Sequence, residues 1–187
     1  MKHYRSIRSQ IRSGDVITWE GRGPVSWLIR RWSHRSHASM CIDFADYRGD
    51  DRRYLLEAWE GEFNIRLLSK RLQNYSGKAF WHQLNPELDP FRRMIEYNAF
   101  SLIGTGYDYQ SLFLNAICKV NTKADLLFCS EAPCHVFTQS IPLKILKGYR
   151  GSRYANMMID GVALRPGGIA RLPLFLDEVE IIKDEEE

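Results

Sequence analysis

The sequence predicts an α+β fold, with most strands in the first half of the chain and most helices in the second. Segments in which apolar and polar residues alternate, a pattern typical of strands, recur between residues 16 and 84. After Pro90 the spacing of the apolar residues becomes helical. A last segment of strand character covers residues 171–182. Strands first and helices later favour a sheet packed against a separate helical layer.

The first strand and the first helix follow a turn. Gly14 and Asp15 form a turn signal, and the alternating residues after it predict a strand over 16–19. Pro24 suits the first turn of a helix, and an apolar face at helical spacing extends this helix to residue 32. That face consists of Val25, Leu28, Ile29 and Trp32. We expect it to pack in the core, and contact with a membrane surface is the alternative.

Three further strands are expected, over 37–44, 52–61 and 78–84. In the strand over 37–44, alternation places His37, Ser39 and Cys41 on one face and the apolar residues between them on the other. A polar turn precedes the strand over 52–61, and we expect His37 and Glu57 to lie on adjacent strands.

The second half predicts three helices. The first covers 91–104 and is closed by Gly104 and Gly106; its apolar positions are Phe91, Met94, Ile95 and Leu102. The second covers 107–119, with Asp108 at its N-cap. The third begins directly after Cys129, at Ser130.

Length and charge limit the classes of protein to consider. The chain has 187 residues, of which 44% are hydrophobic, enough for one core, so we expect a single domain over 1–187 with its core at about 13–180. A basic segment lies at the N-terminus and an acidic tail at the C-terminus. Lys and Arg number 26 against 23 Asp and Glu, a net charge of +3, which is too small to predict a nucleic-acid partner.

The sequence contains no signal peptide that we can recognise. The first residues lack an apolar core, and no run approaches the ~20 apolar residues of a membrane span. We therefore expect a cytoplasmic protein, unless a phage particle or a secretion apparatus delivers it. Peripheral membrane contact stays open, because Trp27, Leu28 and Ile29 adjoin a basic cluster. The four cysteines match no disulfide or zinc framework and are expected to be reduced.

Cys129 is the strongest candidate for a nucleophile. It directly precedes the expected helix start at Ser130, where unpaired backbone N–H groups stabilise a thiolate relative to its free pKa of ~8.5. The same N–H groups are suited to stabilise an oxyanion. Taken alone, a buried core cysteine is the more common role. Cys41, Cys118 and Cys134 lie inside expected elements and have weaker claims.

A cysteine nucleophile needs a base and a group that orients that base. His37 begins a strand after a polar turn and is the best candidate for the base, whereas His135 lies too far along its helix from Cys129. Glu57 is a carboxylate among apolar residues, which indicates a buried group with a partner. Glu60 is a possible substitute for Glu57.

The order of these motifs resembles a known family. The segments "GDVI", "SHAS", "LLEAW", "GTGYDY", "FCSE" and "LRPGGIARLPLF" are similar in order to the circularly permuted NlpC-like papain-fold enzymes of the YiiX-like branch. The resemblance covers about residues 13–180. It implies a permuted papain-like fold, with an antiparallel sheet packed against a helical layer that carries the nucleophile.

The resemblance also assigns roles to residues. It implies that Cys129 is the nucleophile, His37 the base and Glu57 the third polar residue. Tyr107 is implied to line the cleft, and Ser130 follows the nucleophile in the family's C-S-E signature. Ser39 stands where the family commonly has glycine, so we count it with Tyr107 and Ser130 as a substrate-binding candidate.

These residues predict a cysteine-dependent hydrolase that cleaves an amide or ester bond in a peptide, isopeptide or lipid acyl substrate through an acyl-enzyme. An acyltransferase of the lecithin:retinol acyltransferase type and a non-catalytic binding module that retains the cleft are the alternatives. We expect no cofactor and no metal, since His34, His37 and Cys41 have irregular ligand spacing. The oligomeric state stays open.

Overall fold

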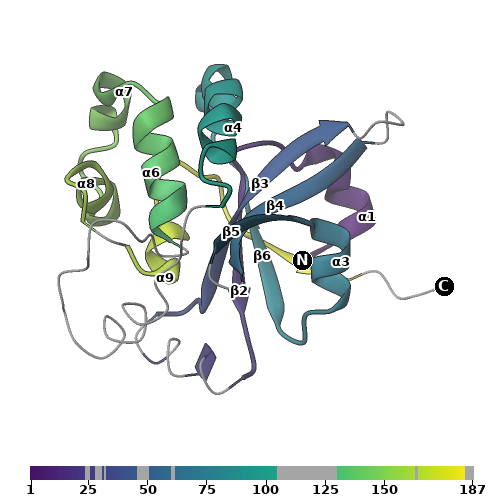
Figure 1. The fold of residues 1–187 in the computed structure, drawn as a ribbon. Helices are drawn as coiled ribbons and strands as arrows, with labels where there is room; N and C mark the ends of the chain where they lie inside the picture. The colour runs from purple at the N-terminus through teal and green to yellow at the C-terminus, as the bar shows by residue number, and fades with distance from the viewer. Residues whose placement is uncertain are drawn as a thin grey trace.

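The structure is a computed structural model that describes residues 1–23, 26–27, 31, 33–45, 51–59, 62–104, 130–162 and 164–183. These residues have the predicted α+β architecture, a twisted sheet with helices on both of its faces (Figure 1). None of the helices that the structure describes is both long and apolar enough to cross a membrane.

The strands of the described chain form one seven-stranded sheet in the order β1-β7-β6-β2-β3-β4-β5. β1 pairs with β7 in parallel, and the other neighbours are antiparallel. The bounds are β1 Lys2–His3, β2 Val16–Glu20, β3 His37–Ala45, β4 Asp51–Trp59, β5 Glu62–Leu67, β6 Lys78–His82 and β7 Val179–Ile182.

The helices that the structure describes in full are short and fall into two groups. One group covers one face of the sheet and consists of η2 Pro86–Phe91, α4 Arg92–Phe100, α6 Glu131–Ser140, α7 Leu143–Gly148, α8 Arg153–Ile159 and α9 Pro166–Ile169. The other group covers the opposite face and consists of α1 Tyr4–Ile7, η1 Arg8–Gln10 and α3 Leu68–Gln73.

Strand alternation separates the two cores. On β3, Ala38, Met40 and Ile42 belong to the larger core under α4 and α6, whereas Cys41 belongs to the smaller core under α1 and α3. The alternation predicted for 37–44 is therefore confirmed. Every second side chain of β3, including Ser39 and Cys41, thus lies on the face of the sheet that α3 covers.

Several predicted elements differ from the structure in extent. The helix expected over 91–104 is a 3₁₀ helix followed by α4, which ends at Phe100 before a turn that Gly104 closes with a φ of 77°. Ile95, Ala99 and Leu102 face the core there, but Met94 is exposed. The expected strand over 171–182 forms only β7 at its end, because an irregular segment precedes it.

The sequence reading missed β5 and α3 between two predicted strands. Residues 62–73 alternate weakly and carry several polar residues, so no strong periodicity marks them. The helix expected over 107–119 lies outside the described residues, as does most of the helix expected over 24–32.

Candidate active site

His37 and Glu57 come together from neighbouring strands. β3 and β4 are antiparallel, and the register that pairs Met40 with Leu56 brings Glu57 beside the first residues of β3. His37 Nε2 lies 3.1 Å from Glu57 Oε2, within hydrogen-bond distance. The two residues that the sequence selected as base and orienting carboxylate are therefore in direct contact.

The Glu57 carboxylate is buried, with 0% of its side chain exposed, and is satisfied by several donors. Arg71 Nε of α3 donates to both of its oxygens, at 3.1 and 3.3 Å. Ser39 Oγ donates to Oε2 at 3.2 Å, and Arg66 Nε of β5 lies 3.8 Å from Oε1. Burying a carboxylate is costly without such partners, so this set fixes Glu57 in one place.

These partners keep Glu57 ionised. Burial by itself would raise the pKa of Glu57, but the hydrogen bond and charge of His37, together with the Arg71 guanidinium, outweigh burial and hold the pKa below its ordinary value of 4.5. An ionised Glu57 attracts a proton on the His37 ring. It also holds Nε2 toward itself, so Nδ1 is the nitrogen through which His37 would exchange protons with a reacting group.

Aromatic residues support this arrangement from β2 and from the end of α3. Trp19 Nε1 donates to Ser39 Oγ at 2.9 Å, so Ser39 passes a hydrogen bond from Trp19 to Glu57. The Arg71 guanidinium lies 4.9 Å from the ring centres of both Trp19 and Tyr75. Such contacts restrict the rotamers of a long side chain and preserve its donor geometry.

The position of His37 at the beginning of β3 decides what its ring can reach. Its register partner is Trp19, which belongs to the core under α3, so His37 starts on the α3 face of the sheet. The His37 side chain is 19% exposed, and as the first residue of β3 it lies at the end of the sheet. α6 packs on the opposite face, so a group at its N-terminus must meet His37 around that end of the sheet.

The start of α6 is fixed near this end of the sheet through α9. Ser130, the N-cap residue of α6, is buried and its hydroxyl donates to the carbonyl oxygen of Leu164. The α9 helix, which begins two residues later, packs on β3, and Gly167 N of α9 donates to Ser33 Oγ at 2.8 Å. Figure 1 shows α6 beginning beside α9, near the strand that contains His37.

A cleft of about 670 Å³ opens beside the chain segment that leads to His37. Its wall is formed by residues of that segment, of the end of β2, of α9 and of the chain between α9 and β7, including Glu20, His34, Arg35, Gly167 and Phe175. Arg35 is held rigidly there, since it is bound by Glu20 and by Glu178 at 2.8 Å and stacks 3.7 Å from the centre of the Phe80 ring.

The remaining predicted site residues are placed as follows. Ser39 and Ser130 are both buried, the first against Glu57 and the second against Leu164. Cys129, Tyr107 and Glu60 lie outside the described residues, so their predicted roles stay predictions. Cys129 directly precedes Ser130 in the chain and thus precedes the first turn of α6.

His82, His135 and the two described cysteines, Cys41 and Cys134, are poor candidates for catalysis. His135 is exposed on α6, and burial lowers the pKa of His82 to about 4. Burial also raises the pKa of the Cys41 and Cys134 thiols, which disfavours a thiolate at either position. Among the described residues, no group of three or more His, Cys, Asp or Glu side chains is arranged to hold a metal ion.

Sequence reasoning missed Arg71 and Trp19 as part of the site. Arg71 lies on a helix that was not predicted, and nothing in its local sequence connects it to a carboxylate 14 positions earlier. The only signal was the expectation that a buried Glu57 needs partners, which did not say where in the chain they would lie.

Nucleophilic catalysis needs a base that a third group orients, and His37 with the buried Glu57 could form such a pair. No family model and no curated protein matches the sequence. Among solved structures, the metalloprotein YiiX from Escherichia coli O157:H7 is similar, with a TM-score of 0.62 and 16% identity over 94% of this chain and 98% of YiiX. The predicted resemblance to YiiX is thereby confirmed at the level of the fold.

Proposed function

We propose that the protein is a cysteine-dependent hydrolase that cleaves an amide or ester bond through an acyl-enzyme on Cys129. The observation that carries this proposal is the contact of 3.1 Å between His37 and the fully buried, ionised Glu57. A purely structural role for this pair would not call for a buried charge with four partners, since apolar packing is usually as stable as a buried ion pair.

The proposed chemistry begins with His37 as the general base. Nδ1 of the ring takes the proton of the Cys129 thiol, and the thiolate attacks the carbonyl carbon of the substrate. The imidazolium then gives its proton to the departing amine or alcohol. Water, activated by the same ring, releases the acyl group and restores the thiol.

Glu57 and its neighbours have supporting roles. The Glu57 carboxylate stabilises the imidazolium and fixes the ring orientation, as the carboxylate of a serine-protease triad does. Arg71 and Ser39 hold the carboxylate. Because Ser39 is buried against Glu57, we assign it this positioning role and not direct contact with substrate. Backbone N–H groups at the start of α6 would stabilise the oxyanion.

The cleft beside residues 33–35 is the proposed substrate site. It adjoins the segment that leads to His37, and it presents Arg35 and Arg171 together with Glu20, Asp177 and Glu178. A wall of mixed charge suits a polar substrate such as a peptide better than a purely apolar chain. We therefore favour a peptide or isopeptide amide over a lipid ester.

YiiX is named a metalloprotein, and among the described residues of this chain no group of three or more His, Cys, Asp or Glu side chains is arranged to hold a metal ion. His37 is engaged with Glu57, Cys41 is buried, and His34 is exposed.

The proposal is tested by incubating the protein with peptidyl and acyl probes that carry an electrophilic carbonyl group, and then locating adducts by mass spectrometry. We expect an adduct on Cys129 that is lost in Cys129→Ser and strongly reduced in His37→Ala. An unmodified Cys129 across the whole panel would contradict the proposal. An acyl group that moves to an added amine instead of water would identify a transferase.

A further inference from the structure

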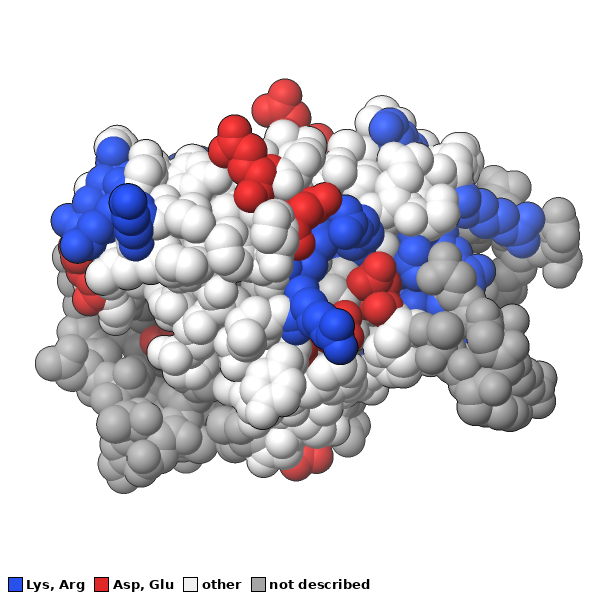
Figure 2. Space-filling view, turned by 90° about the horizontal axis from the view of Figure 1, so that it is seen from above, with Lys and Arg blue, Asp and Glu red and all other residues white. Residues whose placement is uncertain are grey.

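The helices α7 and α8 form a basic surface at one end of the molecule. Residues 142–162 contain four cations and one acid, which are Lys144, Lys147, Arg150, Arg153 and Asp160. All four cations are exposed. Figure 2 shows Lys and Arg side chains gathered at the left end of the face seen from above, the end at which α7 and α8 lie in Figure 1. We call the exposed part of residues 142–162 the α7–α8 surface.

Most of this positive charge is not neutralised by the part of the chain that the structure describes. Arg150 pairs with Asp160 at 3.1 Å, and both side chains stay about half exposed, at 46% and 56%. Lys144, Lys147 and Arg153 make no ion pair with any described residue. Three cations of this surface are therefore available to an anionic partner.

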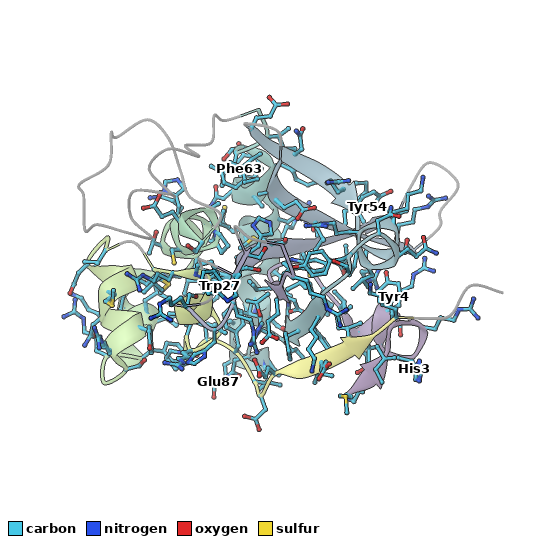
Figure 3. The ribbon with its side chains drawn as sticks, turned by 90° about the horizontal axis from the view of Figure 1, so that it is seen from below. His3, Tyr4, Trp27, Tyr54, Phe63 and Glu87 are labelled. Carbon is cyan, nitrogen blue, oxygen red and sulfur yellow. The ribbon has the colours of Figure 1, made fainter. Side chains whose placement is uncertain are left out.

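A second acid, Glu87 of η2, borders the α7–α8 surface on its inner side. Burial and the charge of Glu87 raise the pKa of Tyr149, the first residue after α7, so Glu87 lies close to this residue. Figure 3, which views the molecule from below, shows Glu87 to the right of the yellow-green α8, on the side toward the sheet. The outer side of the surface therefore keeps its excess of positive charge.

Exposed aliphatic side chains lie among these cations. The buried residue of α7 is Leu146, whereas Leu143 and Ile145 are 52% and 38% exposed. Val162, two residues after Asp160, is 50% exposed. A segment that exposes both lysines and aliphatic side chains is typical of a surface that meets a bilayer. There the cations contact anionic headgroups, and the apolar side chains enter the boundary between headgroups and acyl chains.

The core beneath α7 and α8 holds this surface in place. The two helices pack on each other, and Leu146 and Met158 anchor them in the larger core. Arg153 lies five residues before Met158, which places it about 140° around α8 from that buried side chain. Arg153 therefore faces away from the core, and the exposed lysines of α7 need no rearrangement to meet a partner.

We propose that the α7–α8 surface docks on an anionic lipid bilayer. A bilayer fits both properties of the surface, because it offers negative headgroups to the cations and an apolar layer to Leu143 and Ile145. A nucleic acid would contact the cations through its phosphates but would leave these aliphatic side chains in water. The surface is separate from the His37–Glu57 pair, and the proposal does not depend on the proposed hydrolase activity.

Sedimentation of the full chain with vesicles tests the proposal. We expect the protein to sediment with vesicles of phosphatidylcholine and phosphatidylserine, more weakly as salt is added, and not with phosphatidylcholine alone. Lys144→Gln/Lys147→Gln/Arg153→Gln should lower the partition coefficient about fivefold for each cation removed, or roughly a hundredfold in total. Arg150 stays unchanged in this variant, because it pairs with Asp160. A wild-type protein that does not sediment with the anionic vesicles would overturn the proposal.

The matched control is Lys2→Gln/Arg22→Gln/Lys70→Gln, which removes two lysines and one arginine from exposed positions outside the α7–α8 surface. Lys2 of β1 and Lys70 of α3 lie at the other end of the molecule (Figure 1). The control should sediment like the wild type. Equal loss in the two variants would mean that the vesicles respond to net charge, and loss in the control alone would mean that another surface meets the membrane. Either result would overturn the proposal.

A second variant, Leu143→Ser/Ile145→Ser, keeps every charge and separates a bilayer from other polyanions. It should lower the partition coefficient about tenfold, because two aliphatic side chains no longer enter the bilayer. Sedimentation equal to that of the wild type would show that these side chains stay in water, which contradicts docking on a bilayer. Tighter binding of the wild type to a single-stranded oligonucleotide than to the vesicles, unchanged in this variant, would assign a nucleic acid as the partner and would also overturn the proposal.

Discussion

A carboxylate as deeply buried as that of Glu57 persists in its charged form only when donors surround it, and here the donors come from β3, β5 and α3. Three of these donors are arginine or histidine side chains, and their charges and hydrogen bonds favour the ionised form of Glu57. The consequence at the residue scale is that small changes to this set should affect both the protonation of Glu57 and the orientation of His37.

Glu57→Gln keeps the shape of the side chain and removes its charge. We expect iodoacetamide to alkylate Cys129 about tenfold more slowly near neutral pH, because the imidazolium that accompanies the thiolate loses its counter-charge. The free energy of unfolding should fall by about 1 to 3 kcal/mol, since Arg71 then lacks its buried anion. Mass spectrometry of the modified peptide and urea denaturation measure the two effects.

Glu60→Gln is the control for this prediction and settles the choice between the two glutamates. It should leave both quantities close to those of the wild type. If instead Glu60→Gln slows the alkylation and Glu57→Gln does not, the orienting role belongs to Glu60.

Arg71 is a positioning residue whose role is visible in a pH profile. The pKa of Glu57 is held below its ordinary value, so its contribution to stability is present above about pH 4.5 and is lost as the pH falls through the folded-state value. Arg71→Gln should raise that pKa and move this loss of stability to higher pH, while Arg71→Lys should restore part of the shift. Chemical denaturation of the three proteins between pH 7 and pH 4 gives the free energy of unfolding at each pH. The same pH dependence in all three proteins would show that Arg71 does not lower the pKa of Glu57.

At the scale of elements, α9 keeps the start of α6 and the start of β3 in a fixed relation. A Cβ atom at Gly167 would lie 2.8 Å from Ser33 Oγ and 3.1 Å from His34 N, so a larger residue has to push α9 away from the segment before His37. Ser33 and His34 lie only three or four residues before His37. Displacement here should therefore change the distance between Cys129 and the His37 ring.

Gly167→Ala should slow the alkylation of Cys129 and lower the free energy of unfolding by about 1 to 3 kcal/mol, as overpacking does elsewhere. Gly148→Ala at the end of α7 is the matched control, since a Cβ atom there meets nothing within 4 Å. The same alkylation rate of Cys129 in both alanine variants would show that α9 does not align the start of α6 with the start of β3.

Some elements were predictable because strong local patterns mark them, and others were not. Strict alternation in 37–44 gave β3 and the correct faces for His37 and Ser39, and the turn at Gly14-Asp15 gave the start of β2. Residues 62–73 have no such pattern, because β5 is an edge strand and α3 is a short helix with only two buried residues. Their structure depends on packing against β4, which local sequence does not encode.

The same distinction applies to the site. The pairing of His37 with Glu57 was predictable, because each residue has an unusual local context and the family resemblance places them in order. The contributions of Arg71 and Trp19 were not, since these contacts join distant parts of the chain. Cys129, Tyr107 and Glu60 lie outside the described residues, and their roles stay predictions.

At the scale of the whole molecule, the sheet carries different charges and clefts at its two ends. β4 passes from Arg52 and Arg53, which line a cleft of about 530 Å³, to the buried Glu57, and α3 contributes Ser69 to the wall of that cleft and Arg71 to the partners of Glu57. The fold is similar to that of YiiX, while the permuted papain-like arrangement and the single-domain organisation over 1–187 stay predictions.

The buried His82, on the α6 side of the sheet, should make the free energy of unfolding depend on pH. Burial lowers the pKa of His82 to about 4 from an ordinary value of 6.5, and Thr18 Oγ1, 2.8 Å from Nε2, also accepts from Arg35. Between these two values the unfolded chain binds a proton that the folded chain does not, so stability falls as the pH falls. The change should reach about 3 kcal/mol.

His82→Asn isolates this contribution from those of the carboxyl groups. Urea denaturation at pH 7 and at pH 4 should show a smaller loss of stability for the variant than for the wild type. An identical loss in both proteins would mean that His82 is not kept neutral by the fold.

The rate of iodoacetamide alkylation at each cysteine, measured by peptide mass spectrometry across pH in the wild type and in His37→Ala, tests the central claim most directly. The account predicts that Cys129 reacts near neutral pH faster than Cys41 and Cys134, whose thiol pKa values are raised by burial, and that His37→Ala removes the advantage. A Cys129 that reacts no faster than Cys41 and Cys134, or whose rate is unchanged in His37→Ala, would contradict a catalytic pair formed by Cys129 and His37.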